Sequence, residues 1–415
     1  MTPAKAVWPI LSATLLLFIS ADASAQRCFL NDEGKYVNAT GGLCVNTIQT
    51  AVPFLTISPD ARSAALGDAG VALSPTAASS HWNGSALAFS QERFEIQATF
   101  TPWLQALNLD DVYLANLAMY GKLSETEVLF GDLRYFSLGD IEFTDVNGQA
   151  ISTGKPYEMA VTFGYARKLT DKISASLAGR FILSALASGL TVPNNPGVEI
   201  GPGTSGAADI GFSYVDDINL GSNGATLRVG AGVRNIGAKI TYTTASQRDY
   251  IPTNLAVGAS IETFFDDYNS LTFTTDFNKL LVPSQPLNEE DPDFMDNDGN
   301  GRPDYLDKSP VEGIFSSFGD ASGGPGEELR EINVSLGAEY WYANQFAARV
   351  GYFHESNTKG GRQYLTLGLG IKYSVLGLDF SYLVPTTATR NPLDNTLRFG
   401  LNYAFAPTTP EGVVN

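Results

Sequence analysis

The sequence predicts an all-β membrane protein, a fourteen-stranded antiparallel transmembrane β-barrel with a short helical N-terminal plug. Three observations favour this fold class. Segments of about ten residues alternate between large apolar and small or polar side chains, as tilted membrane strands do. Short and long connections between these segments alternate along the chain. Beyond the N-terminus, no run of about 18 or more apolar residues predicts a membrane-spanning helix.

The N-terminus has the pattern of a secretory signal. Lys5 precedes the apolar run Ala13–Ile19, and small residues follow at Ala23 and Ala25. A basic start, a short apolar run and an A-x-A site are typical of a cleaved signal peptide. We therefore predict a signal peptide at residues 1–25, with export of the remaining chain.

The two cysteines, Cys28 and Cys44, both lie in the exported N-terminal segment. In an oxidising compartment we expect them to form one disulfide that closes a small loop, the alternative being two free thiols. The pair is not a CxxC motif and has no histidine nearby, so a metal or redox centre is not expected.

Residues 26–88 are predicted to form an N-terminal arm and a helical plug. The Ser58-Pro59 and Ser74-Pro75 pairs place a capping hydroxyl before a proline, which predicts the starts of two short helices. Gly67 ends the first helix, and the second runs towards His81. This block is too rich in Ala and Ser to form a core alone. We expect it to plug the barrel near its mouth, the alternative being an arm on the rim.

The barrel is predicted at residues 89–405, followed by a C-terminal tail at residues 406–415. In Leu365–Tyr373 every second residue is large and apolar, and the intervening residues are Thr, Gly or Lys. A strand turns successive side chains to opposite faces, so such a segment has a lipid face and a lumen face. The fourteen predicted strands are residues 91–101, 112–122, 126–138, 157–169, 172–184, 206–216, 225–235, 253–263, 269–279, 330–341, 344–354, 363–373, 376–384 and 395–405.

The same alternation assigns side chains to the two faces of the barrel. The predicted lipid-facing residues include Phe94, Ile96, Phe100, Val161, Phe163, Leu177, Phe181, Leu367, Leu369, Leu378, Phe399 and Leu401. The predicted lumen-facing residues include Glu95, Gln97, Glu158, Thr162, Arg180, Arg398 and Asn402.

Loop length separates the two ends of the predicted barrel. Connections after even-numbered strands are short, whereas those after odd-numbered strands are longer, with the longest at residues 280–329. Outer-membrane barrels have short periplasmic turns and long external loops, and a soluble sandwich has no reason to sort loops in this way. We therefore predict an integral outer-membrane protein with both termini on the periplasmic side and residues 280–329 as a long acidic extracellular loop.

The net charge of −18 argues against nucleic acid as a partner, because proteins that bind nucleic acid present basic patches. Much of the negative charge lies in the long predicted loop, where Glu289–Glu312 is far richer in acidic than in basic residues.

This loop contains the spacing of an EF-type calcium loop. Counted from Asp296, oxygen-bearing side chains fall at positions 1, 3, 5, 9 and 12, which are Asp296, Asp298, Asn300, Asp304 and Asp307. Gly301 at position 6 permits the sharp turn that such loops need. Position 12 is Asp rather than the usual Glu, as it often is in thrombospondin-type and dockerin repeats, which the loop resembles. We expect a structural Ca²⁺, the alternative being a solvated acidic loop.

Few residues in the sequence could form a catalytic site, because the chain has only two histidines, His81 and His354. His354 and Ser356 fall on one strand face, which would suit an outer-membrane lipase, but no third residue orients a base against the serine. His81-Trp82 is expected to pack at the contact between plug and barrel. We predict that the protein is not an enzyme.

Three N-terminal segments, Phe54–Arg62, Gly67–Ala72 and His81–Asn83, resemble the signature of the PorV/PorQ family of the type IX secretion system of Bacteroidetes. The acidic loop and the terminal strand Leu397–Phe405 look similar too. The resemblance covers nearly the whole exported chain and implies a FadL-like fourteen-stranded barrel in the outer membrane.

The resemblance also implies a function without catalysis. Family members bind the C-terminal signal domain of secreted cargo as it leaves the large translocon barrel, and pass the cargo to the cell-surface sortase and attachment complex. The expected partners are therefore this translocon, the signal domains, the sortase complex and outer-membrane lipid. The contact surfaces would be the long loops at residues 185–205, 236–252 and 280–329. The alternative is a FadL-type transporter of hydrophobic small molecules, which would need an apolar lumen pocket where the predicted lumen residues are polar.

Overall fold

The computed structural model describes residues 28–31, 36–38, 42–104, 109, 111–144, 148–192, 195–220, 223–243, 247–287, 291–387 and 395–405. The predicted signal peptide (1–25) and the predicted C-terminal tail (406–415) lie outside these residues. None of the helices in the described part of the chain combines the length and the apolar character needed to cross a bilayer.

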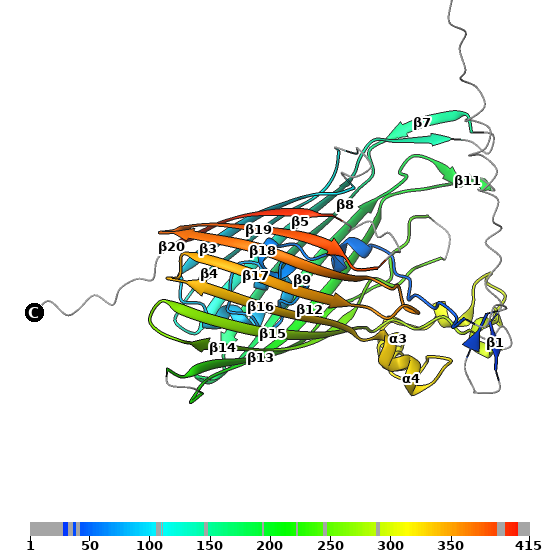
Figure 1. Cartoon of the computed structure of the whole chain (residues 1–415). Coiled ribbons are helices and arrows are strands. Elements are labelled where there is room, and N and C mark those ends of the chain that lie inside the picture. The colour runs from blue at the N-terminus through cyan, green and yellow to red at the C-terminus, as the bar shows by residue number, and fades with distance from the viewer. Residues whose placement is uncertain are drawn as a thin grey trace, which may run out of the picture.

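The alternating segments form fourteen antiparallel strands that close into a barrel, because the last strand pairs with the first (Figure 1). Each predicted strand has its counterpart, so the predicted fold class is confirmed. The barrel strands are β3 (Phe94–Pro102), β4 (Val112–Lys122), β5 (Glu127–Leu138), β8 (Tyr157–Lys168), β9 (Ile173–Ala185), β12 (Gly203–Ile218), β13 (Ala225–Gly237), β14 (Asn254–Phe264), β15 (Asn269–Leu280), β16 (Asn333–Tyr342), β17 (Phe346–His354), β18 (Gln363–Tyr373), β19 (Leu376–Pro385) and β20 (Leu397–Phe405).

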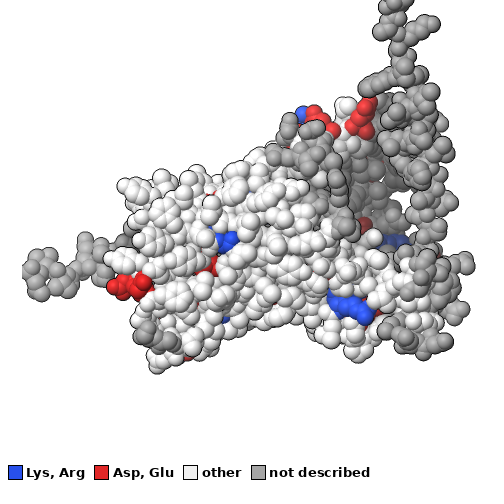
Figure 2. Space-filling model, viewed as in Figure 1, with Lys and Arg blue, Asp and Glu red and all other residues white. Residues whose placement is uncertain are grey.

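The two faces of the wall have the predicted chemistry. Phe163 on β8 is 73% exposed, whereas its chain neighbour Thr162 is 1% exposed. On β20, Phe399 is exposed and Arg398 is buried. Figure 2 shows the side of the barrel almost free of charged residues, as a surface in contact with hydrocarbon must be.

Short and long connections lie at opposite ends of the barrel, as expected. Residues 123–126, 169–172, 219–224, 265–268, 343–345 and 374–375 form the short connections. Residues 103–111, 139–156, 186–202, 238–253, 281–332, 355–362 and 386–396 form the connections at the other end. β3 begins and β20 ends at the end with the short turns, and the elements of the long loops lie at the opposite end (Figure 1).

Several long loops carry structure of their own that the sequence did not predict. Two hairpins extend the barrel wall, β6 (Ile141–Thr144) with β7 (Ala150–Gly154), and β10 (Thr191–Val192) with β11 (Asn195–Glu199). The longest loop holds the 3₁₀ helices η4 (Pro292–Phe294), η5 (Asp304–Leu306) and η6 (Leu329–Glu331) and the α-helices α3 (Pro310–Ser316) and α4 (Pro325–Glu328). In the arm, β1 (Phe29–Leu30) pairs with β2 (Tyr36–Val37).

The plug occupies the lumen. It contains η1 (Pro53–Thr56), α1 (Ala61–Ala64), α2 (Ser79–Trp82) and η2 (Gly84–Phe89), and nearly all of its side chains are buried. Figure 1 shows these segments surrounded by the strands.

The predicted helix starts in the plug were wrong. Asp60 rather than Ser58 caps α1, because its carboxylate accepts the backbone N–H of Ser63 at 2.8 Å. The helix after Pro75 begins later than predicted, at Ser79, and its preceding residue, Ala78, makes no side-chain cap.

Glycines on the inner wall bring plug and barrel into close contact. A Cβ at Gly351 on β17 would lie 2.0 Å from the backbone nitrogen of Gly67, and one at Gly368 on β18 would lie 2.3 Å from the Cβ of Ala65. Gly67 itself has a φ of +71°, which a residue with a side chain rarely adopts. The small residues of the lumen-facing strand positions are therefore where the plug backbone meets the wall.

Candidate functional site at the loop end of the barrel

A cavity of about 550 Å³ lies where the arm, the plug and the loop end of the wall meet. The arm contributes residues 47–50 and the plug contributes Pro53, Thr56 and Asp68. The wall and its loops contribute residues that include Arg234, Lys359 and Arg362.

Charged side chains of both signs line this cavity. Arg362 is held by Glu355, with Nε 2.9 Å from one carboxylate oxygen and Nη2 2.8 Å from the other. Arg398 is 1% exposed and its Nε has no hydrogen-bond partner among the described residues. Asp68 accepts a hydrogen bond from the hydroxyl of Tyr364. Apolar side chains such as Leu55, Ile57 and Phe353 line the cavity too, so it offers both charged and apolar contacts.

Ion pairs and hydrogen bonds fix the plug beneath the cavity. Arg62 of α1 pairs with Glu339 of β16, and Glu339 also accepts from Arg349 of β17 at 2.6 Å. On the neighbouring strand β15, the carboxylate of Asp276 accepts the backbone N–H groups of Gly70 and Val71. The sequence placed polar residues on the lumen face but gave no signal for the contacts between plug and wall, which join positions over two hundred residues apart.

His81 lies at the contact between plug and barrel, as expected. Its side chain is 3% exposed, and its Nε2 is 3.0 Å from Nη1 of Arg234 on β13. The suggested pair of His354 and Ser356 is not brought together in the described structure. The ring of His354 lies beside Tyr352, with centroids 6.3 Å apart, and the hydroxyl of Ser356 contacts that of Thr358 at 3.1 Å.

A buried cluster of charges ties the longest loop to its neighbours. Lys359, in the β17–β18 loop, is 2.5 Å from Glu327 and 3.0 Å from Glu331. Glu327 also accepts from the Nδ2 of Asn46 in the arm at 3.2 Å. Three segments distant in sequence are thus held together at the rim. In the same arm, Cys28 and Cys44 are joined in a disulfide with their Cα atoms 6.2 Å apart.

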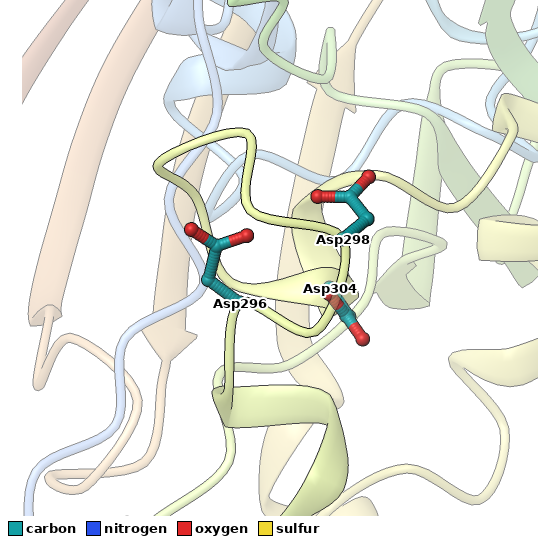
Figure 3. Close-up of side chains that lie close together, drawn as sticks. All are labelled: Asp296, Asp298 and Asp304. Carbon is teal, nitrogen blue, oxygen red and sulfur yellow. The ribbon is translucent and has the colours of Figure 1, made fainter.

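The five residues of the predicted calcium loop converge. One carboxylate oxygen each from Asp296, Asp298 and Asp304 lies within 4.8 Å of the others (Figure 3). Asn300 donates to Asp298 at 3.0 Å and to Asp307 at 2.8 Å.

The backbone of this loop also has the form that the motif needs. Gly301 has a φ of +86°, in the left-handed region that favours glycine. The backbone N–H groups of Gly301 and Asn300 donate to Asp296 and hold the pKa of its exposed carboxyl below the usual range. An ionised, preformed set of oxygens is what a hard cation such as Ca²⁺ takes as ligands.

Several solved structures resemble this chain. They include the Ralstonia pickettii toluene transporter TbuX, with 11% identity, coverage of 85% of this chain and 99% of that chain, and a TM-score of 0.48. The Pseudomonas aeruginosa FadL homologue has 11% identity, coverage of 88% and 100%, and a TM-score of 0.42. At such scores and identities we draw no conclusion from these likenesses. None of the curated proteins compared with the chain matches it.

A match to a family model shows which protein family the chain belongs to. The model described as "Type IX secretion system protein PorV" matches residues 43–287, which is more than half of the 415 residues. The matched part contains the arm from Leu43, the whole plug and the barrel strands from β3 to β15. The chain therefore belongs to the PorV family and is an outer-membrane protein of the type IX secretion system.

Proposed function

We propose that this protein binds the C-terminal signal domain of secreted cargo as it leaves the translocon and carries it to the cell-surface sortase and attachment complex, without catalysing a reaction itself. Membership of the PorV family supports the secretion role. The observation that carries the binding role is the cavity at the loop end, which is lined by charged and apolar side chains of the arm, the plug, the wall and its loops.

The contacts that hold the site together support a docking role. The plug is held by buried ion pairs, and the rim loops are tied to one another by the cluster around Lys359. Binding residues are commonly placed on loops that a rigid scaffold positions. Hydrophobic import would instead need an apolar pocket, whereas Arg362, Glu355 and Arg398 place charged groups around this cavity.

We further propose that Asp296, Asp298, Asn300, Asp304 and Asp307 bind a structural Ca²⁺. The EF-type spacing and the convergence of three carboxylates support this site. Without an ion these carboxylates repel one another, so the metal would stabilise the fold of the loop and take no part in chemistry.

The test is a binding measurement with purified protein in detergent and a purified signal domain as ligand. Gln49→Trp and Thr56→Trp each add bulk to an exposed side chain of the cavity lining. We expect each variant to weaken binding of the signal domain by about tenfold or more, as expected when a close-packed contact is obstructed. The matched control is Asp171→Trp in a short turn at the opposite end, which should bind as the unmodified protein does.

Two results would contradict the proposal. Equal binding by the cavity variants and the control would remove the cavity from the site. Failure of the unmodified protein to bind any signal domain, together with a fatty acid retained in the cavity, would favour the transporter alternative.

A further inference from the structure

An apolar groove of about 630 Å³ lies on the outside of the barrel, on the lipid side of the wall. Its wall side is formed by Leu255 and Val257 of β14 and Phe277 of β15. Its other side is formed by residues of the longest loop, chiefly Phe318 and Leu329. This part of the loop lies beyond the residues that the family model matches.

The position of Lys279 shows that the loop folds down over the outer face. By strand alternation Lys279 points outwards, on the same side of β15 as Phe273 and Phe277. Its side chain is nevertheless buried, because Glu328 and Glu331 of the loop cover it. The ammonium lies 3.0 Å from Glu328 and also contacts Glu331. Figure 1 shows α3 and α4 beside the loop ends of the strands rather than over the lumen.

The same segment exposes large apolar side chains that a water-facing loop would not display together. Phe318 is 53% exposed and Leu329 is 69% exposed. Val311 and Phe315 are exposed too, and their spacing of four residues places them on one face of α3. Several large apolar side chains exposed on one short segment indicate a site of interaction.

The groove is continuous with the lipid-facing surface of the barrel. Val257 and Phe277 belong to the outward-facing set of their strands and are 42% and 46% exposed. The groove therefore opens onto the hydrocarbon that surrounds the wall, and the charge of Lys279 at its edge is neutralised by Glu328. A helical segment can attach to a membrane by burying its apolar residues in the interface.

We propose that this groove binds an acyl chain of an outer-leaflet lipid, with the α3–α4 segment lying in the membrane interface. The wall provides one side of the site, and Phe318 and Leu329 cover the chain from the other. The segment would then be anchored by lipid on its outer side and by the Lys279 contacts on its inner side.

The immersion of the segment can be measured with spin labels in proteoliposomes. Both native cysteines are in the disulfide, so an introduced cysteine is the reactive thiol. Labels at Phe318→Cys and Leu329→Cys should collide with oxygen and be shielded from a water-soluble nickel complex, like a label at the lipid-facing Leu367→Cys. A label at Glu142→Cys, exposed on the β6–β7 hairpin at the same end of the barrel, provides the aqueous reference. Accessibility to nickel like this reference, or shielding from both reagents, would overturn the proposal.

The occupant can be tested by native mass spectrometry of the detergent-solubilised protein. We expect one retained lipid that Val257→Trp loses, because the indole fills the groove, and that Leu367→Trp keeps, since Leu367 lies on the wall outside the groove. Retarded gel mobility on heating in SDS verifies that each variant is folded. Equal lipid retention by both variants, or no retained lipid, would overturn the proposal. So would a photo-crosslinker at Phe318 that captures a protein rather than lipid in intact cells.

Discussion

Arg62 of the plug and Glu339 of the barrel wall form a bidentate ion pair in which Nη2 lies 2.6 Å and Nε 2.9 Å from the two carboxylate oxygens. Both side chains are almost fully buried, and Arg349 donates to the same carboxylate and to Asp379. The charges of the plug and of three strands thus form one connected network. Each member is hydrogen-bonded, which is the condition under which buried charge is tolerated.

Replacing Glu339 by Gln should destabilise the protein, because two guanidinium groups then lose the carboxylate that compensates them. Breaking a buried pair by removing one partner costs about 3–5 kcal/mol. The measurement is the temperature at which the folded band in SDS gels converts to the unfolded band. Asp140→Asn is the matched control, because it breaks the solvent-exposed pair with Lys155 and should have little effect. Equal stability of E339Q and the control would contradict the anchoring role of the pair.

Phe163→Lys should destabilise the barrel through its lipid face. Phe163 is 73% exposed near the middle of β8, and a lysine near the bilayer midplane costs about 2–4 kcal/mol. Folding titrations into lipid vesicles measure this free energy. Phe163→Leu, which keeps an apolar side chain at the same position, should remain close to the unmodified protein. A lysine variant that is equally stable would place Phe163 away from hydrocarbon.

Removing Ca²⁺ with a chelator should increase protease cleavage within residues 280–329, and Asp296→Ala or Asp298→Ala should have the same effect with calcium present. Asp307→Glu serves as a control, since Glu is the usual residue at position 12 and should keep the calcium-dependent protection. Limited proteolysis with peptide mapping gives the cleavage sites. Cleavage that is independent of calcium in the unmodified protein would argue for a solvated acidic loop.

The stability of the longest loop should fall as pH rises towards neutrality. Burial raises the pKa of Asp320 to about 7. The nearby carboxylates of Glu331 and Glu328 also raise this pKa, whereas the N–H of Ser284 and the ammonium of Lys279 lower it. In the unfolded loop the carboxyl has a pKa of about 3.9. Between roughly pH 4 and pH 7 the folded loop thus binds a proton that the unfolded loop releases, so the free energy of unfolding decreases across this range.

Asp320→Asn should remove most of this pH dependence. Protease resistance of residues 280–329, measured from about pH 4 to 8 with calcium in excess, provides the test. Asp171→Asn, in an exposed turn at the other end, should leave the slope unchanged. A slope that is the same in D320N and the unmodified protein would show that other groups set the pH response.

The sequence by itself determined the barrel, the two faces of its wall and the residues of the acidic loop. Side chains alternate strictly along a strand, so the pattern in Leu365–Tyr373 already separates a lipid face from a lumen face. The alternation of short and long connections shows which strand ends lie at the same end of the barrel. The spacing of Asp296, Asp298 and Asn300 is likewise local, and a local pattern can be identified without knowing the fold.

Tertiary structure alone decided which distant residues meet. Nothing in the sequence pairs Arg62 with Glu339, and the burial of an outward-facing Lys279 depends on where a long loop folds back. Asp60 rather than Ser58 caps α1, and the same carboxylate also accepts from the indole of Trp82 inside the lumen. Such pairings depend on distances across the barrel, which alternation, loop length and motif spacing do not specify.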